Sequence, residues 1–177
     1  MPAKQNHTRS LVLAAMLIAL YVALSTLSIR TGNIRITLDS LPIVVAGALL
    51  GPLYGLAVGL IGNFFEQLIF FGLMPTTVLW IVADGVRGLI IGWYARKKGY
   101  HLDWENLTYI SVLAALAVTF INTVMLHLDN LILHGVSPVA IVTASLIWRM
   151  LLGVGTTLVI TAVLPRLLGP VEKLLRD

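Results

Sequence analysis

Long segments without charge constrain this chain more than any other feature of its sequence. Asp, Glu, Lys and Arg make up only 11% of its 177 residues, whereas soluble domains carry about 25%. A helix needs roughly 20 apolar residues to cross the hydrocarbon core of a bilayer. The sequence therefore predicts an all-α membrane protein, a six-transmembrane-helix bundle that occupies residues 1–177 as a single domain. The expected helices lie at 10–29, 38–51, 53–71, 76–95, 107–128 and 138–164.

Glycines and prolines set the expected limits of several helices. Gly32 and Asn33 mark an outer loop after the first helix. The second helix should stop at Gly51, because Pro52 lacks a backbone donor and disfavours helix before it. With roughly 14 residues at 1.5 Å each, this helix reaches only about 20 Å, so it is expected either to tilt little or not to cross the bilayer fully. Pro165 is expected to close the sixth helix.

Lysines and arginines gather in alternate connections, which predicts the orientation of the bundle. With six helices, eight basic residues share one side of the membrane, while only Arg30 and Arg35 lie in loops on the other. Because cytoplasmic loops carry the excess of Lys and Arg, both termini are expected to be cytoplasmic. The eight residues are Lys4, Arg9, Arg96, Lys97, Lys98, Arg166, Lys173 and Arg176.

Several functional classes are excluded by what the sequence lacks. It contains no cysteine, which excludes disulfides and thiolate chemistry. No second histidine lies at metal spacing from His127, so no metal site and no cofactor is expected. The basic residues lie at helix ends, which leaves no aqueous basic face for a nucleic-acid partner. Without a G-x-x-x-x-G-K-[ST] phosphate loop, ATP hydrolysis would have to come from a partner.

Ionisable side chains inside the expected spans are the candidate functional residues, because burying charge in a bilayer is costly. Helical spacing places amide and tryptophan side chains on the same faces as these charges. Aromatic walls with a few polar groups are typical of a ligand cavity. The alternative is a structural ion pair, either Asp84 with Arg87 or Glu66 with Arg149. The candidate substrate-binding residues are Arg35, Asn63, Glu66, Gln67, Trp80, Asp84, Arg87, Asn122, Trp148 and Arg149.

A stripe of small side chains runs along the first expected helix. Ala15, Ala19 and Ala23 recur every four residues and so share one face. In a bilayer, small residues at this spacing let another helix approach closely. The stripe therefore predicts a helix contact, either with a partner protein or within the chain itself.

With these features the chain resembles the S components of energy-coupling-factor (ECF) transporters, six-helix proteins that bind vitamins for bacterial uptake. The resemblance covers essentially the whole chain. It rests on the alanine stripe and on residues 35–43 (RITLDSLPI), 46–55 (AGALLGPLYG) and 87–92 (RGLIIG). It implies a bacterial cell-membrane protein that captures its vitamin near the outer surface, between the outer loop and helices three to six. It also implies that the alanine stripe faces an energy-coupling module of one transmembrane coupling protein and two ATPases.

The Gly-Pro run followed by Arg-Gly is most similar to the folate branch of this family, which makes folate or a related pteridine the leading ligand. A pterin edge presents a donor pair that Glu66 or Asp84 would accept, and Trp80 would stack on the ring. Arg35 or Arg149 would pair with the carboxylates of the glutamate tail. Residues 63–67 (NFFEQ) and 75–80 (PTTVLW) depart from that branch. Cobalamin, another pteridine and a deazaguanine precursor therefore remain open.

Two other classes compete with an S component. Asp84-Gly85-Val86-Arg87 matches the opening of the CDP-alcohol phosphotransferase motif, but the aspartates that should follow the next glycine are missing. The chain is therefore not expected to be an enzyme. A stand-alone proton-coupled carrier would use Asp84 or Glu66 as a proton relay, and it would transport its substrate without a partner.

Overall fold

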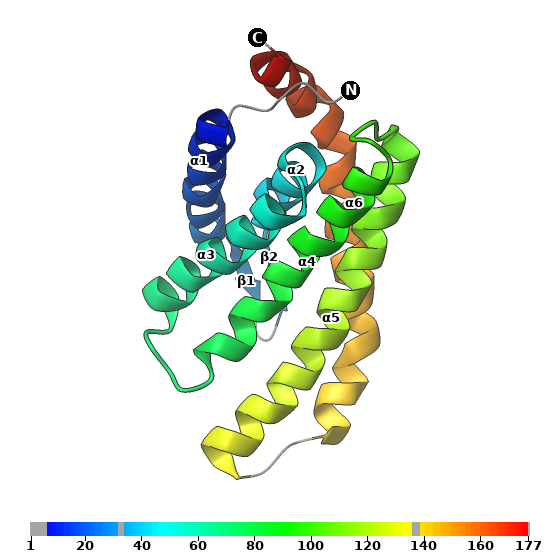
Figure 1. The fold of residues 1–177 in the computed structure, drawn as a ribbon. Helices are drawn as coiled ribbons and strands as arrows, with labels where there is room; N and C mark the ends of the chain where they lie inside the picture. The colour runs from blue at the N-terminus through cyan, green and yellow to red at the C-terminus, as the bar shows by residue number, and fades with distance from the viewer. Residues whose placement is uncertain (1–6, 32–33, 136–138, 177) are drawn as a thin grey trace.

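The structure, a computed structural model, describes residues 7–31, 34–135 and 139–176. Within these residues it contains six helices and one short hairpin (Figure 1), which confirms the expected helical bundle. Five helices are long and apolar enough to cross a membrane, and the second is not. The elements are α1 (His7–Thr26), β1 (Ile29–Thr31), β2 (Ile34–Ile36), α2 (Ser40–Leu50), α3 (Pro52–Phe70), α4 (Thr77–Lys97), α5 (Trp104–His134) and α6 (Val139–Arg176).

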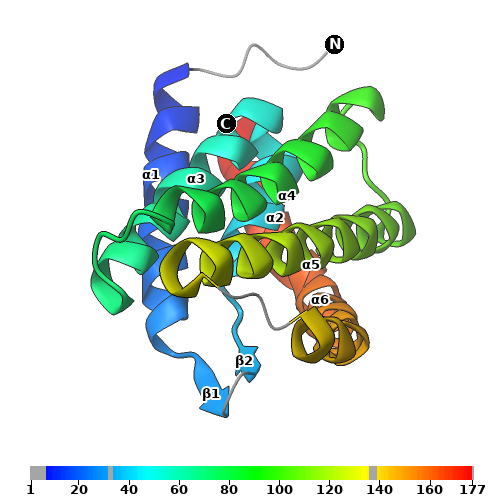
Figure 2. The ribbon, with the colours of Figure 1, turned by 90° about the horizontal axis from the view of Figure 1, so that it is seen from below.

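A β-hairpin follows α1, where an irregular loop was expected. The first helix ends at Thr26, so the prediction that it continues to residue 29 is wrong. Strands β1 and β2 pair antiparallel, with Arg30 opposite Arg35, and Figure 2 shows the hairpin beside the helices. The physical reason is local, because Ile and Thr favour extended backbone and a Gly-Asn pair between such runs is a hairpin signal.

The short helix α2 forms the centre of the bundle. Eight of its 11 residues are buried, and its length corresponds to about 16 Å at 1.5 Å per residue. It stops where expected: Gly51 has a φ of 99°, which favours glycine, and Pro52 occupies the first turn of α3. Its side chains Val44, Val45 and Ala48 pack in one apolar core with residues of α4, α5 and α6.

The last helix does not stop at Pro165, so that prediction is wrong. Helix α6 continues to Arg176. A proline removes the N–H that would bond the carbonyl four residues earlier, which here belongs to Thr161. The indole Nε1–H of Trp104 donates to that Thr161 carbonyl at 3.0 Å. Because a side chain from α5 replaces the missing donor, the helix can pass through the proline.

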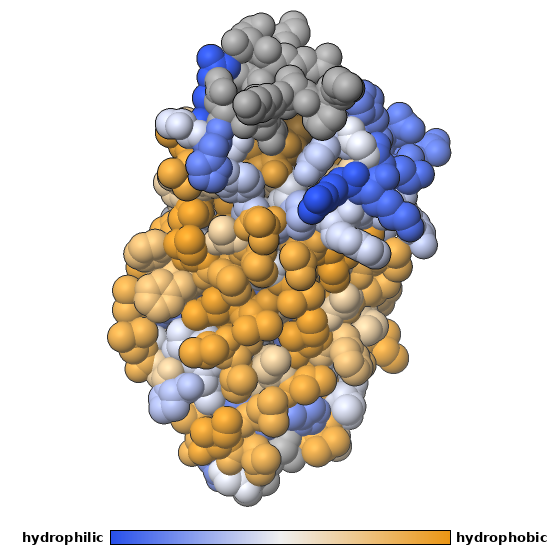
Figure 3. Space-filling model, viewed as in Figure 1, coloured by the Kyte–Doolittle hydropathy of each residue, from blue (hydrophilic) through white to orange (hydrophobic). Residues whose placement is uncertain are grey.

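The distribution of polar residues fits a protein that crosses a membrane. Helix α1 begins and α6 ends at the same end of the bundle, where the α4–α5 connection also lies (Figure 1). Arg96, Lys97 and Lys98 are exposed there. Figure 3 shows hydrophilic residues gathered at this end and apolar side chains over the middle of the visible face. This grouping agrees with the predicted orientation, which stays a prediction as to which side is cytoplasmic.

Candidate functional site

A buried polar network joins α1, α3 and α4. The hydroxyl of Tyr21 lies 2.8 Å from Glu66 Oε2 and 2.9 Å from Asp84 Oδ2. Asn63 Nδ2 donates to the same Asp84 oxygen at 2.8 Å, and Arg87 lies 3.4 Å from Asp84 Oδ1. Tyr21 is fully buried, and Glu66 is 2% exposed. The network therefore holds two carboxyl groups and a guanidinium together, with the side chains of Asp84 and Arg87 14% and 17% exposed.

Glycines allow the three helices to approach closely enough for these contacts. A side chain at Gly62 would meet the Tyr21 ring at 2.7 Å, and one at Gly59 would meet the backbone of Asp84. Gly55 and Gly88 likewise face each other across α3 and α4. Small residues at these positions bring the backbones together and place the polar side chains of the network within reach of one another.

A second feature lies between α6 and the segment that follows the hairpin. A groove of about 370 Å³, called here the α6 groove, is lined by Leu38, Leu151, Leu152, Gly155, Thr156 and Val159. Arg149 lies three residues before Leu152 and seven before Thr156, so the three share one face of the helix. The Nη1 atom of Arg149 is buried and has no hydrogen-bond partner among the residues that the structure describes. Arg149 does not itself line the groove, but an unpaired guanidinium nitrogen on the same helix face is suited to receive an acceptor atom of a ligand.

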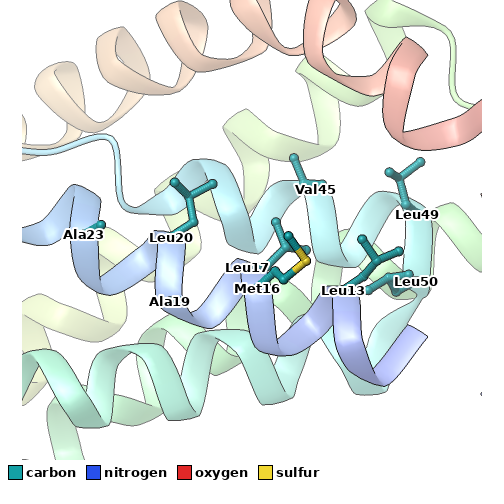
Figure 4. A pocket seen from close by; sticks show the side chains of 9 residues that line it. All are labelled: Leu13, Met16, Leu17, Ala19, Leu20, Ala23, Val45, Leu49 and Leu50. Carbon is teal, nitrogen blue, oxygen red and sulfur yellow. The ribbon is translucent and has the colours of Figure 1, made fainter. Parts of the chain in front are cut away.

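A larger groove of about 500 Å³, called here the α1 groove, lies between α1 and α2. Figure 4 shows apolar side chains of both helices gathered along it. Ala19 and Ala23 line it, and Ala15, Ala19 and Ala23 are all exposed. The opposite face of α1, which includes Ala14, Tyr21 and Ser25, is buried in the bundle. The lining residues are Leu13, Met16, Leu17, Ala19, Leu20, Ala23, Val45, Leu49 and Leu50.

A match to a protein-family model decides the family to which this chain belongs. A family model described as "ECF-type riboflavin transporter, S component" matches residues 5–168. The chain belongs to the S-component family of ECF transporters. It is therefore a multi-pass protein of the bacterial cell membrane. S components are the substrate-binding subunits of transporters, so the chain is not an enzyme.

Relatives of this S component include UPF0397 proteins of Streptococcus pneumoniae serotypes 19F and 4. Each is 30% identical to it over 122 residues, which cover 66% of this chain and 65% of the relative. The match thus spans just under two thirds of the length of these relatives.

Two solved structures share the fold. A crystal structure of FolT bound with folic acid has a TM-score of 0.62 at 22% identity, and covers 87% of this chain and 94% of that one. The S component for biotin from an ECF-type ABC transporter has a TM-score of 0.57 at 19% identity, with coverage of 91% and 94%. At such identities the likeness concerns the fold alone.

The S component brings together only part of the predicted binding set. Asn63, Glu66, Asp84 and Arg87 meet in the buried network, where they contact one another and Tyr21. The network includes the ion pair between Asp84 and Arg87, which was the predicted alternative to a ligand-binding role.

Within the described part of the chain, no hydrogen bond or ion pair joins the side chains of the other predicted residues to this network. Gln67, Trp80, Asn122 and Arg149 are half-buried, and Trp148 is 56% exposed. Trp80 meets the network through its backbone carbonyl, which accepts from Asn63 Nδ2 at 3.4 Å. Among the residues that the structure describes, no hydrogen bond joins Asn122, Trp148 or Arg149 to the polar network. The backbone of Arg35 lies in β2, and its side chain lies outside the described residues.

Sequence reasoning missed Tyr21 and the lining of the α6 groove. Tyr21 is the one aromatic residue of the first expected helix, which was a signal, because a buried tyrosine hydroxyl needs a polar partner. The run Gly153 to Thr157 places small and hydroxyl side chains in an apolar span, which was a weaker signal. Among the described residues, no group of three His, Asp or Glu side chains is placed to hold a metal ion.

Proposed function

We propose that this S component captures a water-soluble vitamin with a flat, pteridine-derived ring from outside the cell. It then delivers the vitamin for ATP-driven uptake by a module of one transmembrane coupling protein and two ATPases. The observation that supports ligand binding is the buried Nη1 atom of Arg149, which has no hydrogen-bond partner among the described residues. Helical spacing places Arg149 on the face of α6 that carries the groove residues Leu152 and Thr156. A buried donor without a partner costs about 1–3 kcal/mol, more when charged, so a ligand that supplies an acceptor is favoured.

Two vitamins fit the proposed ring. The family model names riboflavin, and FolT, which shares the fold, was solved with folic acid. Both molecules carry a fused pteridine-type ring with polar edges and a flexible polar tail. Arg149 would pair with the carboxylates of a folate tail or with a carbonyl or hydroxyl oxygen of riboflavin. The network residues Asn63, Glu66, Asp84 and Arg87 remain proposed members of the wider site. The same holds for Gln67, Trp80 and Asn122, which are half-buried, and for Arg35 and Trp148.

The α1 groove and the exposed alanines are the proposed contact for the coupling protein. The groove is lined by apolar side chains, and three small residues beside or within it permit close approach of a helix. The buried polar network lies on the opposite face of the same helix. Partner docking and the interior of the bundle thus use two different faces of α1.

The ligand proposal is tested by titrating purified protein with riboflavin and with folate, using the fluorescence of its four tryptophans. We expect one of the two to bind, and Arg149→Gln to weaken it about 10- to 100-fold, because a hydrogen bond to a charged group contributes about 1.5–3 kcal/mol. The exposed Arg96→Gln is the matched control and should leave affinity unchanged. Equal affinity of Arg149→Gln and the parent would exclude Arg149 from the site, and binding of neither vitamin would overturn the ring class.

A further inference from the structure

One face of α4 changes from apolar to aromatic to cationic as the helix approaches its end. Leu89, Trp93 and Lys97 recur every four residues and so share this face; they are called here the α4 stripe. Leu89 is 40% and Trp93 is 65% exposed, and Lys97 is exposed as well. The described part of the bundle therefore leaves the α4 stripe uncovered.

The lysine side chains at this end are held against aromatic rings. Lys97 Nζ lies 6.0 Å from the centroid of the Trp93 ring, and Lys98 Nζ lies 5.9 Å from that of Tyr94. A cation over a ring at about this distance is attracted by the negative face of the ring. The Tyr94 ring is itself held in place, because its hydroxyl donates to Asn106 Oδ1 at 3.0 Å. Both ammonium groups thus fold back along α4 towards the membrane-spanning part of the helix.

The positive charge at the end of the α4 stripe is not neutralised by the acidic residues that follow it. Arg96, Lys97 and Lys98 are three consecutive exposed cations. The next acidic residues along the chain are Asp103 and Glu105. Among the residues that the structure describes, neither of these forms an ion pair with the three cations. The cations are therefore available to an anion from outside the chain.

We infer that the α4 stripe and the adjacent cations bind an anionic phospholipid. The phosphate lies beside the cations, and an acyl chain lies along Trp93 and Leu89. Tryptophan is enriched at headgroup level, and basic residues next to a span attract anionic lipids. A lipid presents a charge and an apolar chain in the same order as the stripe, whereas an acidic protein segment in water would leave Leu89 and Trp93 uncovered. No residue of the stripe lines the α1 groove or the α6 groove, so this site is separate from both.

Tryptophan quenching by brominated lipids tests the inference on the full chain in nanodiscs. Phosphatidylcholine nanodiscs receive increasing fractions of brominated phosphatidylglycerol, which is anionic, or of brominated phosphatidylcholine, which is zwitterionic. Bromine quenches a tryptophan only when the lipid lies beside it, and the exposed Trp93 is the reporter within the stripe. We expect half-maximal quenching at about a fivefold lower fraction of the anionic lipid, the factor that corresponds to one cation near an anionic headgroup. The difference should shrink at high salt.

Variants at exposed positions locate the site. Combining Arg96→Gln, Lys97→Gln and Lys98→Gln should remove the difference between the two lipids, as should Trp93→Phe, which removes the reporter. The matched control Arg9→Gln changes an exposed cation at the same end of the bundle and should retain the difference. Equal quenching of the parent by both lipids would overturn the inference and leave an acidic protein segment as the occupant. A difference that persists in the triple variant or in Trp93→Phe would place the lipid elsewhere and would also overturn it.

Discussion

Replacing Ala19 with tryptophan should reduce ATP-driven uptake to background while leaving vitamin affinity unchanged. Ala19 is exposed and lines the α1 groove between α1 and α2. A bulky ring there would fill the groove and hold a partner helix away, and close packing is the main attraction between helices in a bilayer. The vitamin site is proposed beside α6, so binding should not change. Uptake is measured in proteoliposomes that contain the S component and its coupling module, and affinity is measured on the isolated protein.

The matched control for this experiment is Leu113→Trp, which adds the same ring to an exposed position on α5. It should retain uptake and binding. Parallel loss of binding and uptake in Ala19→Trp would mean that the alanine stripe supports the bundle itself. Normal uptake in Ala19→Trp would mean that the α1 groove does not receive the coupling protein.

Gly88→Ala should destabilise the bundle strongly. A methyl group at Gly88 would clash with the backbone carbonyl group of Gly55 and lie 2.9 Å from its Cα. Backbone atoms cannot move aside as a flexible side chain can, so α3 and α4 would have to separate. We expect a loss of about 3 kcal/mol or more in unfolding free energy, at the upper end of the range for over-packed interiors.

Gly155→Ala is the control for this effect, because nothing lies within 4 Å of the position of its added methyl group. Alanine is about 0.5–1 kcal/mol better than glycine inside a helix, so this change should raise stability slightly. The two variants are compared by unfolding in detergent with circular dichroism as the signal. Similar small effects for both variants would contradict the tight packing between α3 and α4.

The helices could be predicted from the sequence because hydropathy and helix length depend on local residues. The short second helix was expected from Pro52, and α2 is indeed too short to span. The predicted stop at Pro165 failed because Trp104, 61 positions earlier, supplies a donor to the freed carbonyl. A contact over that separation leaves no trace in local propensity. The hairpin after α1 had a local signal in its Ile, Thr and Gly-Asn residues.

The candidate site was harder to predict than the fold. Spacing along one helix grouped Asn63 with Glu66 and Asp84 with Arg87. It could not show that these side chains meet each other through Tyr21, because the rotation of each helix is set by packing at glycines such as Gly59 and Gly62. The alanine stripe of α1 was predicted to be a helix contact, and sequence alone left a partner protein and internal packing equally open. Exposure of Ala15, Ala19 and Ala23 favours a partner outside the chain.

Reconstitution of the purified chain in proteoliposomes tests the central proposal most directly. Radiolabelled vitamin, chosen as whichever of riboflavin and folate binds the isolated protein, is supplied outside the vesicles. Vesicles with the S component alone should bind the vitamin without accumulating it, with or without a proton gradient. Addition of the coupling protein and its two ATPases should give uptake that requires ATP inside the vesicles. Accumulation by the lone chain under a proton gradient would instead identify a self-sufficient carrier and contradict the proposal.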